Sequence, residues 1–162
     1  MKGDPKTIEF LNQALTNELT AINQYWLHYR VLKNWGVERL AAYERHESID
    51  EMKHADTLAD RILFLDGLPN FQAINRLKVG ETVEEILKAD LALELEAIPL
   101  LRDAIQHCEQ VRDYVTREVF ERILESEEEH VDFLETQFDK IARIGLENYV
   151  QLQSKPAEDG DD

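Results

Sequence analysis

Two pairs of side chains in this sequence follow the spacing Glu-x-x-His, which is suited to metal binding. Glu51 precedes His54 by three residues, and Glu127 precedes His130 by the same interval. On a helix, residues three apart are neighbours on one face, so each pair can offer a carboxylate and an imidazole to the same ion. The spacing therefore predicts two related ligand pairs on two helices.

Two further glutamates occupy positions where buried apolar residues belong. Glu18 and Glu94 each interrupt a run of apolar residues that recur at three- and four-residue steps. A constant interval of 76 residues separates three pairs of candidate ligands: Glu18 and Glu94, Glu51 and Glu127, and His54 and His130. The repeat indicates two equivalent helical hairpins, each donating one Glu and one Glu-x-x-His motif, which is the ligand set of dinuclear carboxylate bundles.

Four acids that meet inside a helical bundle need a counter-charge. An ionised carboxylate in an apolar interior is costly unless an opposite charge faces it. No Lys or Arg lies near these acids on the same helical stripes. Bound cations are therefore the predicted counter-charge, and oxygen-rich ligation with one imidazole per ion favours iron or manganese over structural zinc.

The repeat also suggests how two iron ions would share the ligands. The expected sets are Glu18 with His54, Glu94 with His130, and Glu51 and Glu127 as bridges between the ions. Two adjacent iron ions can each give one electron to dioxygen or peroxide, so the predicted activity is a ferroxidase that oxidises Fe(II) to Fe(III). Tyr25 lies one turn beyond Ile22 on the same face. It could hydrogen-bond a ligand or supply an electron, although core packing explains it equally well.

Four long helices are required to bring these residues together, and the apolar periodicity predicts them. They are expected from residue 5 to about 34, from about 37 to the stop at 67, from the cap at 82 through 105, and from the cap at 113 to the stop at 145, with a short fifth helix from 146 to about 153. Residues 68–81 lack this periodicity and form a connection longer than most loops. Two hairpins joined in this way make an all-α, ferritin-like four-helix bundle with one long crossover. Residues 1–153 are expected to form this domain, and the acidic tail, 154–162, is expected to be disordered.

Particular residue types mark the helix ends. The expected N-terminal caps are Asp4 before Pro5, Thr82 with Glu85, and Asp113. Gly67 and Gly145 are expected to stop the second and fourth helices. Pro99 predicts a kink inside the third helix, because its ring removes a backbone donor and crowds the preceding turn.

Composition limits the classes of function. A chain of 162 residues is expected to form one domain. Its 18 Lys and Arg against 34 Asp and Glu give a net charge of −16, which disfavours nucleic acid as a partner. Cations are the natural partners of such a surface, although solubility alone also explains the acidity. The single cysteine, Cys108, excludes an internal disulfide, and no apolar run approaches the roughly 20 residues needed to span a membrane. We therefore expect a cytoplasmic protein without a membrane or nucleic-acid partner.

With these residues in view, the sequence resembles the bacterioferritins, the haem-containing branch of the ferritins. The likeness begins at Met1-Lys2-Gly3-Asp4, covers nearly the whole chain apart from the acidic tail, and is most specific in the run HESIDEMKHAD at residues 46–56. The resemblance implies a hollow octahedral 24-mer, built from dimers, that stores a ferric mineral. The six ligands above would form its ferroxidase centre.

The resemblance also implies b-type haem, one per subunit pair, with Met52 of each subunit as an axial ligand. Met52 directly follows Glu51, so it points about 100° away from the metal-binding face, toward a neighbouring subunit. The expected pocket residues are Asn23, Trp26, Ile49 and Phe71. Core or interface packing explains the apolar members equally well. A ferredoxin-type protein is the candidate reductant.

Three other positions follow from the resemblance. His46 and Asp50, one turn apart, are implied as iron ligands on the cavity side of the shell, and a solvated surface is the competing interpretation. Phe133 stands where some relatives carry Trp, which puts an electron route through that position in question.

Two other functions use the same ligands. A di-iron oxidase or peroxidase would act on a substrate other than iron, without a storage cage. A structural protein would hold cations only to neutralise its buried acids. A rubrerythrin-like electron carrier is disfavoured, because such proteins usually add a cysteine-ligated iron domain and this chain has one Cys.

Overall fold

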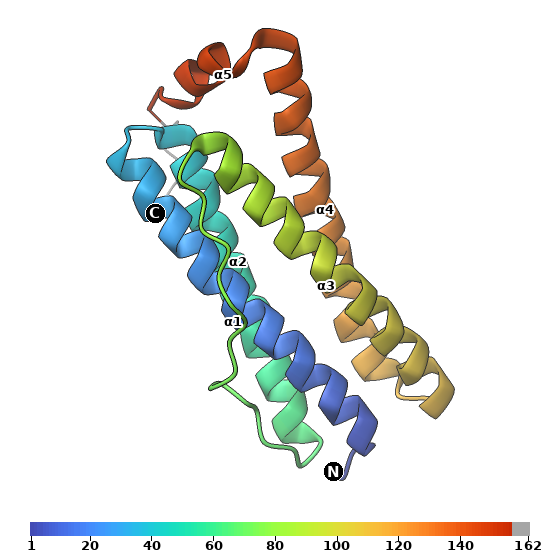
Figure 1. Cartoon of the computed structure of the whole chain (residues 1–162). Coiled ribbons are helices and arrows are strands. Elements are labelled where there is room, and N and C mark those ends of the chain that lie inside the picture. Colours follow the sequence, from blue (N-terminus) through green and yellow to red (C-terminus); the bar gives the residue numbers. More distant parts are fainter. Residues whose placement is uncertain (157–162) are drawn as a thin grey trace.

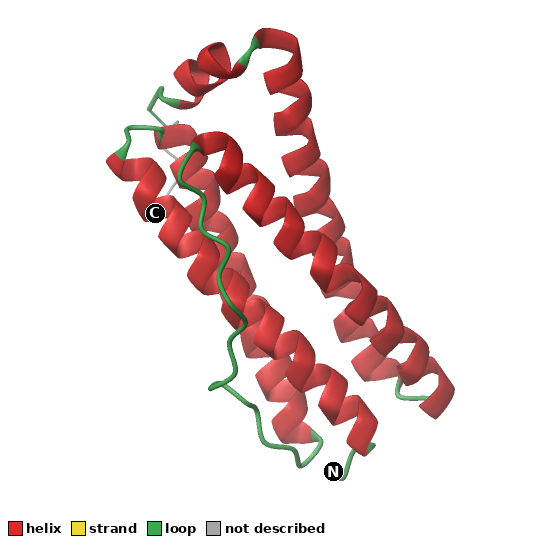
Figure 2. Cartoon of the chain, in the orientation of Figure 1, coloured by secondary structure: helices red, strands yellow, loops and turns green. Residues whose placement is uncertain are grey.

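The protein is all-α in the computed structural model, which describes residues 1–156; residues 157–162 lie outside the described part. The elements are α1 (Pro5–Asn34), α2 (Glu38–Phe64), α3 (Val83–Val111), α4 (Tyr114–Ile144) and α5 (Leu146–Gln153). Over the described residues the chain forms helices and loops without a strand (Figure 2). None of these helices is both long and apolar enough to cross a membrane. The predicted fold class is confirmed.

The four long helices form two hairpins that pack side by side (Figure 1). α1 packs chiefly on α2, and α3 packs chiefly on α4. Between the hairpins, the chain returns along the length of the bundle from the end of α2 to the start of α3 (Figure 1). α5 folds back at the end of α4 and reaches α2, with Tyr149 buried and donating a hydrogen bond to Gln137 Oε1 at 3.1 Å.

Aspartate and threonine side chains start three of the helices as predicted. Asp4 Oδ2 accepts a hydrogen bond from the Thr7 backbone N–H at 2.9 Å, at the start of α1. Asp113 Oδ1 accepts from the Thr116 N–H at 3.1 Å, at the start of α4. Thr82 caps α3 in the same way. Each cap satisfies a backbone donor that the first helical turn leaves unpaired.

The end of α2 differs from the prediction. The helix ends at Phe64, and Asp66 takes the left-handed conformation with φ of 61°. Gly67 then donates its backbone N–H to the Ile62 carbonyl at 2.9 Å. A Cβ at Gly67 would lie 2.9 Å from the side chains of Ile62 and Ile8. Gly67 therefore permits a close approach, while Asp66 makes the turn, a position that aspartate tolerates better than most residues.

The apolar core is divided into two clusters, with a polar section between them. The first cluster includes Leu11, Leu15, Leu58, Ile62, Leu101 and Phe120. The second includes Leu32, Leu40, Ile86, Leu87, Leu134 and Tyr149. Each fully buried side chain of this size contributes about 1.5–3 kcal/mol. Because every long helix contributes to both clusters, the helices are fixed on either side of the section that carries the predicted ligands.

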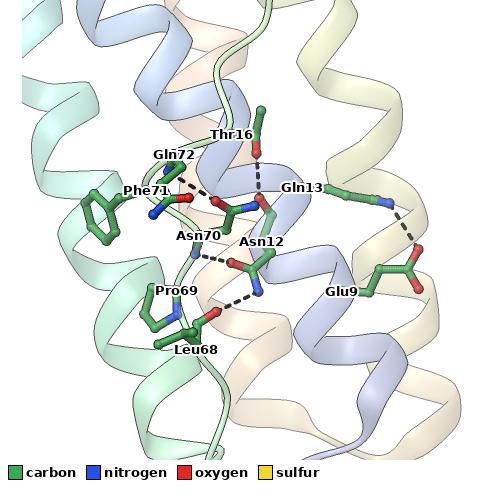
Figure 3. Close-up of a pocket in the computed structure, with 9 residues that line it drawn as sticks. All are labelled: Glu9, Asn12, Gln13, Thr16, Leu68, Pro69, Asn70, Phe71 and Gln72. Atoms are coloured by element: carbon green, nitrogen blue, oxygen red, sulfur yellow. Dashed lines mark hydrogen bonds between the residues drawn. The ribbon is translucent and has the colours of Figure 1, made fainter.

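A row of polar side chains on α1, spaced by four or eight residues, fixes the crossover. We call Asn12, Thr20, Gln24 and His28 the α1 ladder. Its members accept backbone N–H groups as follows: Asn70 to Asn12 Oδ1 at 2.8 Å, Asn75 to Thr20 Oγ1 at 2.9 Å, Lys78 to Gln24 Oε1 at 3.0 Å, and Gly80 to His28 Nε2 at 3.2 Å. Asn12 also donates to the Leu68 carbonyl, beside the pocket shown in Figure 3. Four backbone donors of the irregular crossover therefore have partners on α1.

Two expectations about the second half of the chain stay predictions. α3 continues through Pro99 to Val111, with Pro99 exposed, and the bend expected there is not established. Residues 157–162 of the predicted tail lie outside the described residues, so its disorder, and the domain boundary at residue 153, also stay predictions.

Candidate metal centre

The six predicted ligands come from all four long helices and meet between the two apolar clusters. Glu18 lies on α1 and Glu94 on α3, whereas α2 and α4 each carry one Glu-x-x-His pair. The four carboxylates and His130 are buried, and the His54 side chain is 19% exposed. All six lie in uninterrupted helix, so each Glu and His of a pair share one face.

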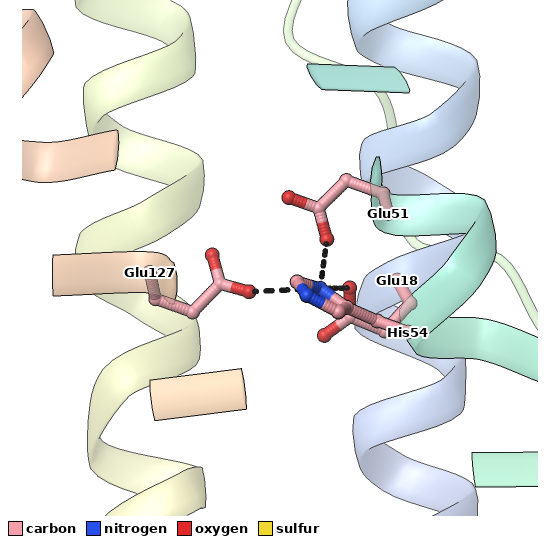
Figure 4. A group of neighbouring side chains, drawn as sticks. All are labelled: Glu18, Glu51, His54 and Glu127. Atoms are coloured by element: carbon pink, nitrogen blue, oxygen red, sulfur yellow. Dashed lines mark hydrogen bonds and ion pairs between the residues drawn. The ribbon is translucent and has the colours of Figure 1, made fainter. Parts of the chain in front are cut away.

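One group of ligand atoms gathers around His54 (Figure 4). His54 Nδ1 lies 3.1 Å from Glu51 Oε2 and 3.4 Å from Glu18 Oε2. Glu127 reaches across from α4 and places its Oε1 atom 3.8 Å from the same nitrogen. Candidate ligand atoms of these four residues all lie within 4.8 Å of one another, so a single ion could contact all of them.

A second group gathers around His130. Its Nδ1 atom lies 3.2 Å from Glu51 Oε1, 3.5 Å from Glu94 Oε1 and 3.6 Å from Glu127 Oε2. Glu51 and Glu127 thus present one oxygen to each group. This is the geometry expected if two ions each had their own Glu and His and shared two bridging carboxylates.

The hydrogen bonding of these side chains tests whether they suit bound cations. Glu18 Oε2, Glu51 Oε1, Glu127 Oε1 and His130 Nδ1 are buried atoms without a hydrogen-bond partner. Buried polar atoms are normally paired, so unpaired carboxylate oxygens within the two ligand groups fit bound positive charges. A donor set of four carboxylates and two imidazoles fits two ions such as Fe(II) or Mn(II).

Burial and mutual repulsion perturb the acids strongly. Burial raises the pKa of Glu18 well above its ordinary value, and the Glu51 and Glu127 carboxylates raise it further. Burial also raises the pKa of Glu127, and the Glu94 and Glu51 carboxylates raise it further. Burial also acts to raise the pKa of Glu51, but its polar neighbours Glu18, His130 and His54 outweigh burial and lower the pKa. When no cation is bound, the carboxyls with raised pKa values, Glu18 and Glu127, therefore hold protons.

Two residues next to the ligands hold them in position. Tyr25 is fully buried, and its hydroxyl donates a hydrogen bond to Glu94 Oε1. Burial and Glu94 raise the pKa of Tyr25 well above its ordinary value, so the hydroxyl stays protonated. Glu47, also buried, pairs with His130 Nε2, which leaves Nδ1 facing the acids. Glu47 was not among the predicted site residues, although it lies one turn before Glu51 on the same helix face.

His46 and Asp50 lie together on a different side of α2. His46 Nδ1 is 3.3 Å from Asp50 Oδ2 and 3.5 Å from Glu47 Oε1. The His46 side chain is 69% exposed, so this group faces the surface. Because Glu47 also touches His130, the surface group adjoins the second ligand group.

Met52 points to the surface, with 55% of the residue exposed. It lines a shallow depression with Asn23, Trp26 and Ile74, and a neighbouring one with Phe71. Three of the four predicted pocket residues therefore lie near Met52. Ile49, the fourth, does not line either depression.

A second buried polar group adjoins the centre, and it was not predicted. It consists of His28, Glu44 and Asp90, all fully buried. His28 Nε2 accepts the Gly80 N–H, so Nδ1 carries the ring proton and donates it to Asp90 Oδ1 at 2.9 Å. Burial and Asp90 raise the pKa of Glu44, which keeps a proton on this carboxyl. Hydrogen bonds thus pair His28 with Asp90, whereas both Glu44 oxygens are buried without a hydrogen-bond partner.

Comparison with known proteins places these features in context. A family model described as "Ferritin-like domain" matches residues 8–144. The chain is 50% identical over 161 residues to a bacterioferritin of Brucella melitensis, covering 99% of this chain and all of that one. It is 49% identical to the bacterioferritin of Rhodobacter capsulatus, covering 96% and 97% of the two chains. A Streptomyces coelicolor bacterioferritin is also 49% identical, with coverage of 99% and 98%.

Replacing the bridging Glu51 by Gln should weaken both ion positions. In the unsubstituted protein, Zn²⁺ at 100 times its dissociation constant should add about 2.7 kcal/mol per site to the free energy of unfolding. Denaturant unfolding with and without Zn²⁺ measures this gain, and Glu51→Gln should lose most of it. Glu128→Gln, which changes an exposed neighbour paired with Arg102, is the control. An equal gain in both variants would contradict the shared-ligand geometry.

Proposed function

This chain belongs to the bacterioferritin family, and we propose on that premise that it stores iron after oxidising Fe(II) to Fe(III). The observation that carries the proposal is the pair of four-residue ligand groups that share Glu51 and Glu127. Two Fe(II) ions bring four positive charges to a site with four carboxylates, so each charge has a partner. The storage of ferric mineral follows from the family, whose named relatives match nearly the full chain.

The chemistry balances with two Fe(II) ions as substrate. Each ion gives up one electron, and dioxygen takes both electrons and two protons to become hydrogen peroxide. If peroxide is the oxidant, the two electrons and two protons break the O–O bond and yield two water molecules. Glu18 and Glu127, whose pKa values are raised, would release protons as the ions bind.

Residues around the ligands would support this reaction. The Tyr25 hydroxyl orients Glu94 through its hydrogen bond, and it lies close enough to the centre to act as an electron donor. Glu47 would keep His130 in the orientation that presents Nδ1 to the ion, a role that partners of metal-bound imidazoles commonly have. We assign His46 and Asp50 to a surface iron site that adjoins this ligand through Glu47.

We further propose that the subunits form a 24-meric shell from dimers, with one b-type haem held between two Met52 side chains. Exposed apolar residues support a subunit contact on this face: Trp26, Met52, Phe64, Leu68, Phe71 and Ile74 are 43% to 82% exposed. Patches of this kind mark interaction surfaces in soluble proteins. An exposed thioether among aromatic side chains fits an axial haem ligand contributed once by each subunit.

Loss of either histidine should reduce Fe(II) oxidation. His54→Ala and His130→Ala each remove the only imidazole of one ligand group, and we expect initial rates to fall by about 100-fold or more. Ferric absorbance after Fe(II) is added in air gives the rate. His107→Ala is the matched control, since His107 pairs with Asp4 away from the centre. Undiminished rates in the first two variants would exclude the proposed ferroxidase centre.

Met52→Leu should abolish haem retention while oxidation of Fe(II) continues. Leucine keeps the apolar bulk but has no sulfur to bind haem iron. The Met52 side chain leaves the helix away from the ligand cluster, so rates should stay within about twofold of the original protein. The haem absorption spectrum of the purified variant, reconstituted with haem, provides the readout. A spectrum like that of the unsubstituted protein would rule out Met52 as the axial ligand.

The shell predicts one large assembly. Sedimentation velocity should give a dominant species close to 24 subunit masses, with dimers as the smaller species at low protein concentration. A protein that remained dimeric or monomeric at high concentration would favour an open di-iron oxidase over a storage cage. The result does not depend on metal or haem occupancy.

A further inference from the structure

A small cavity of about 70 Å³ connects the ligand cluster with the crossover. One side is formed by Glu18, Glu51, Glu94 and Glu127. The other side is formed by crossover residues, including Arg76 and Lys78, and by Glu96 of α3. Two cationic side chains of the crossover therefore lie near these acids, which have no cationic neighbour on their own helical stripes.

We propose that Lys78 is a specificity residue that closes this mouth to cations and leaves it open to small uncharged molecules. Dioxygen and hydrogen peroxide belong to that uncharged class. This inference rests on the proposed function, which identifies the acids behind the mouth as a ferroxidase centre. It adds that cations are excluded from this mouth, whereas the uncharged oxidant can enter there.

The position of Lys78 supports this role. Its Nζ atom lies 2.5 Å from Glu96 Oε1, and the side chains of Lys78 and Glu96 are 37% and 70% exposed. The Nζ atom itself is out of contact with solvent. The ion pair therefore lies where the cavity meets the surface, with the ammonium group on the inner side.

The backbone around Lys78 is held independently of its side chain. The Lys78 N–H donates to Gln24 Oε1, and the flanking Asn75 and Gly80 N–H groups bond to Thr20 and His28 of the α1 ladder. A substitution of the Lys78 side chain leaves these three hydrogen bonds available. The charge at the mouth can therefore be changed without removing the anchors of the crossover.

The charge distribution explains why cations would be excluded at this mouth and not elsewhere. The chain carries a net charge of −16, so its field attracts Fe(II) generally. At this mouth Arg76 and Lys78 against Glu96 leave one excess positive charge in front of the acids. The group of His46, Glu47 and Asp50, which adjoins His130, offers cations an approach lined by carboxylates. Cations and uncharged oxidants would therefore reach the centre by different sides.

Charge reversal at Lys78 tests the exclusion with a redox-inert cation. Stopped-flow mixing of the full-length, metal-free protein with Co(II) follows association through the visible Co(II) absorbance. Lys78→Glu should speed association on the order of tenfold at about 10 mM ionic strength, where the Debye length is about 30 Å. The gain should shrink toward the rate of the unsubstituted protein at about 1 M salt, where that length is about 3 Å.

Three further variants separate charge from other effects. Lys88→Glu makes the same charge change on α3, where Lys88 pairs with Glu84, and should give less than a twofold change. Lys78→Met keeps the length without the charge and should give an intermediate increase. Glu96→Gln breaks the ion pair but keeps the positive charge, so it should give no increase. Equal rates for Lys78→Glu and Lys88→Glu, or equal gains for Glu96→Gln and Lys78→Glu, would overturn the proposal.

A bulky residue at position 78 tests whether uncharged oxidants enter through this mouth. After anaerobic loading with Fe(II), Lys78→Trp should slow oxidation by hydrogen peroxide several-fold, and Lys88→Trp should not. Unchanged oxidation in Lys78→Trp would overturn this part. If the unsubstituted protein bound Co(II) but did not oxidise Fe(II), the proposed ferroxidase function would fail while the Co(II) comparison would still decide the role of Lys78.

Discussion

The structure depends on holding like charges together in the middle of a helical bundle. Four carboxylates converge in a section with almost no access to solvent, and their mutual repulsion opposes folding. The two apolar clusters on either side stabilise the helices on which these acids are carried. Protons, histidine and bound cations are the available means of balancing this charge.

The crossover is part of this site as well as a connection between hairpins. The α1 ladder binds its backbone, and Gln24 and His28 of that ladder also donate to Asp90, one turn before Glu94. The irregular segment is thereby tied to the same turns that carry the ligands. The two hairpins supply equivalent candidate ligands, but the crossover lies along only one side of the bundle. It breaks the symmetry of the repeat, with cationic side chains at one approach and His46, Glu47 and Asp50 at another.

Sequence reasoning could predict whatever depends on spacing along a regular helix. The 76-residue repeat and the Glu-x-x-His motifs were sufficient to place the six candidate ligands, and apolar periodicity and caps gave the helices to within a few residues. The α1 ladder and Lys78 could not be predicted in this way, because the path of an irregular segment depends on tertiary contacts. Asp66 shows the same limit on a small scale, since the left-handed turn was expected at the neighbouring glycine.

α2 is the element on which the separate roles of the subunit converge. Glu51 and His54 face the centre, Met52 faces the apolar surface, and His46 with Asp50 faces a third side, all within three turns. The Ser48 hydroxyl donates to the Ile22 carbonyl at 2.8 Å, which fixes the rotation of α2 against α1. A rotation of α2 by one residue, about 100°, would move every one of these side chains to the wrong face. The packing of α1 on α2 therefore sets the candidate metal centre, the proposed haem contact and the proposed surface site together, and none of the three can be repositioned alone.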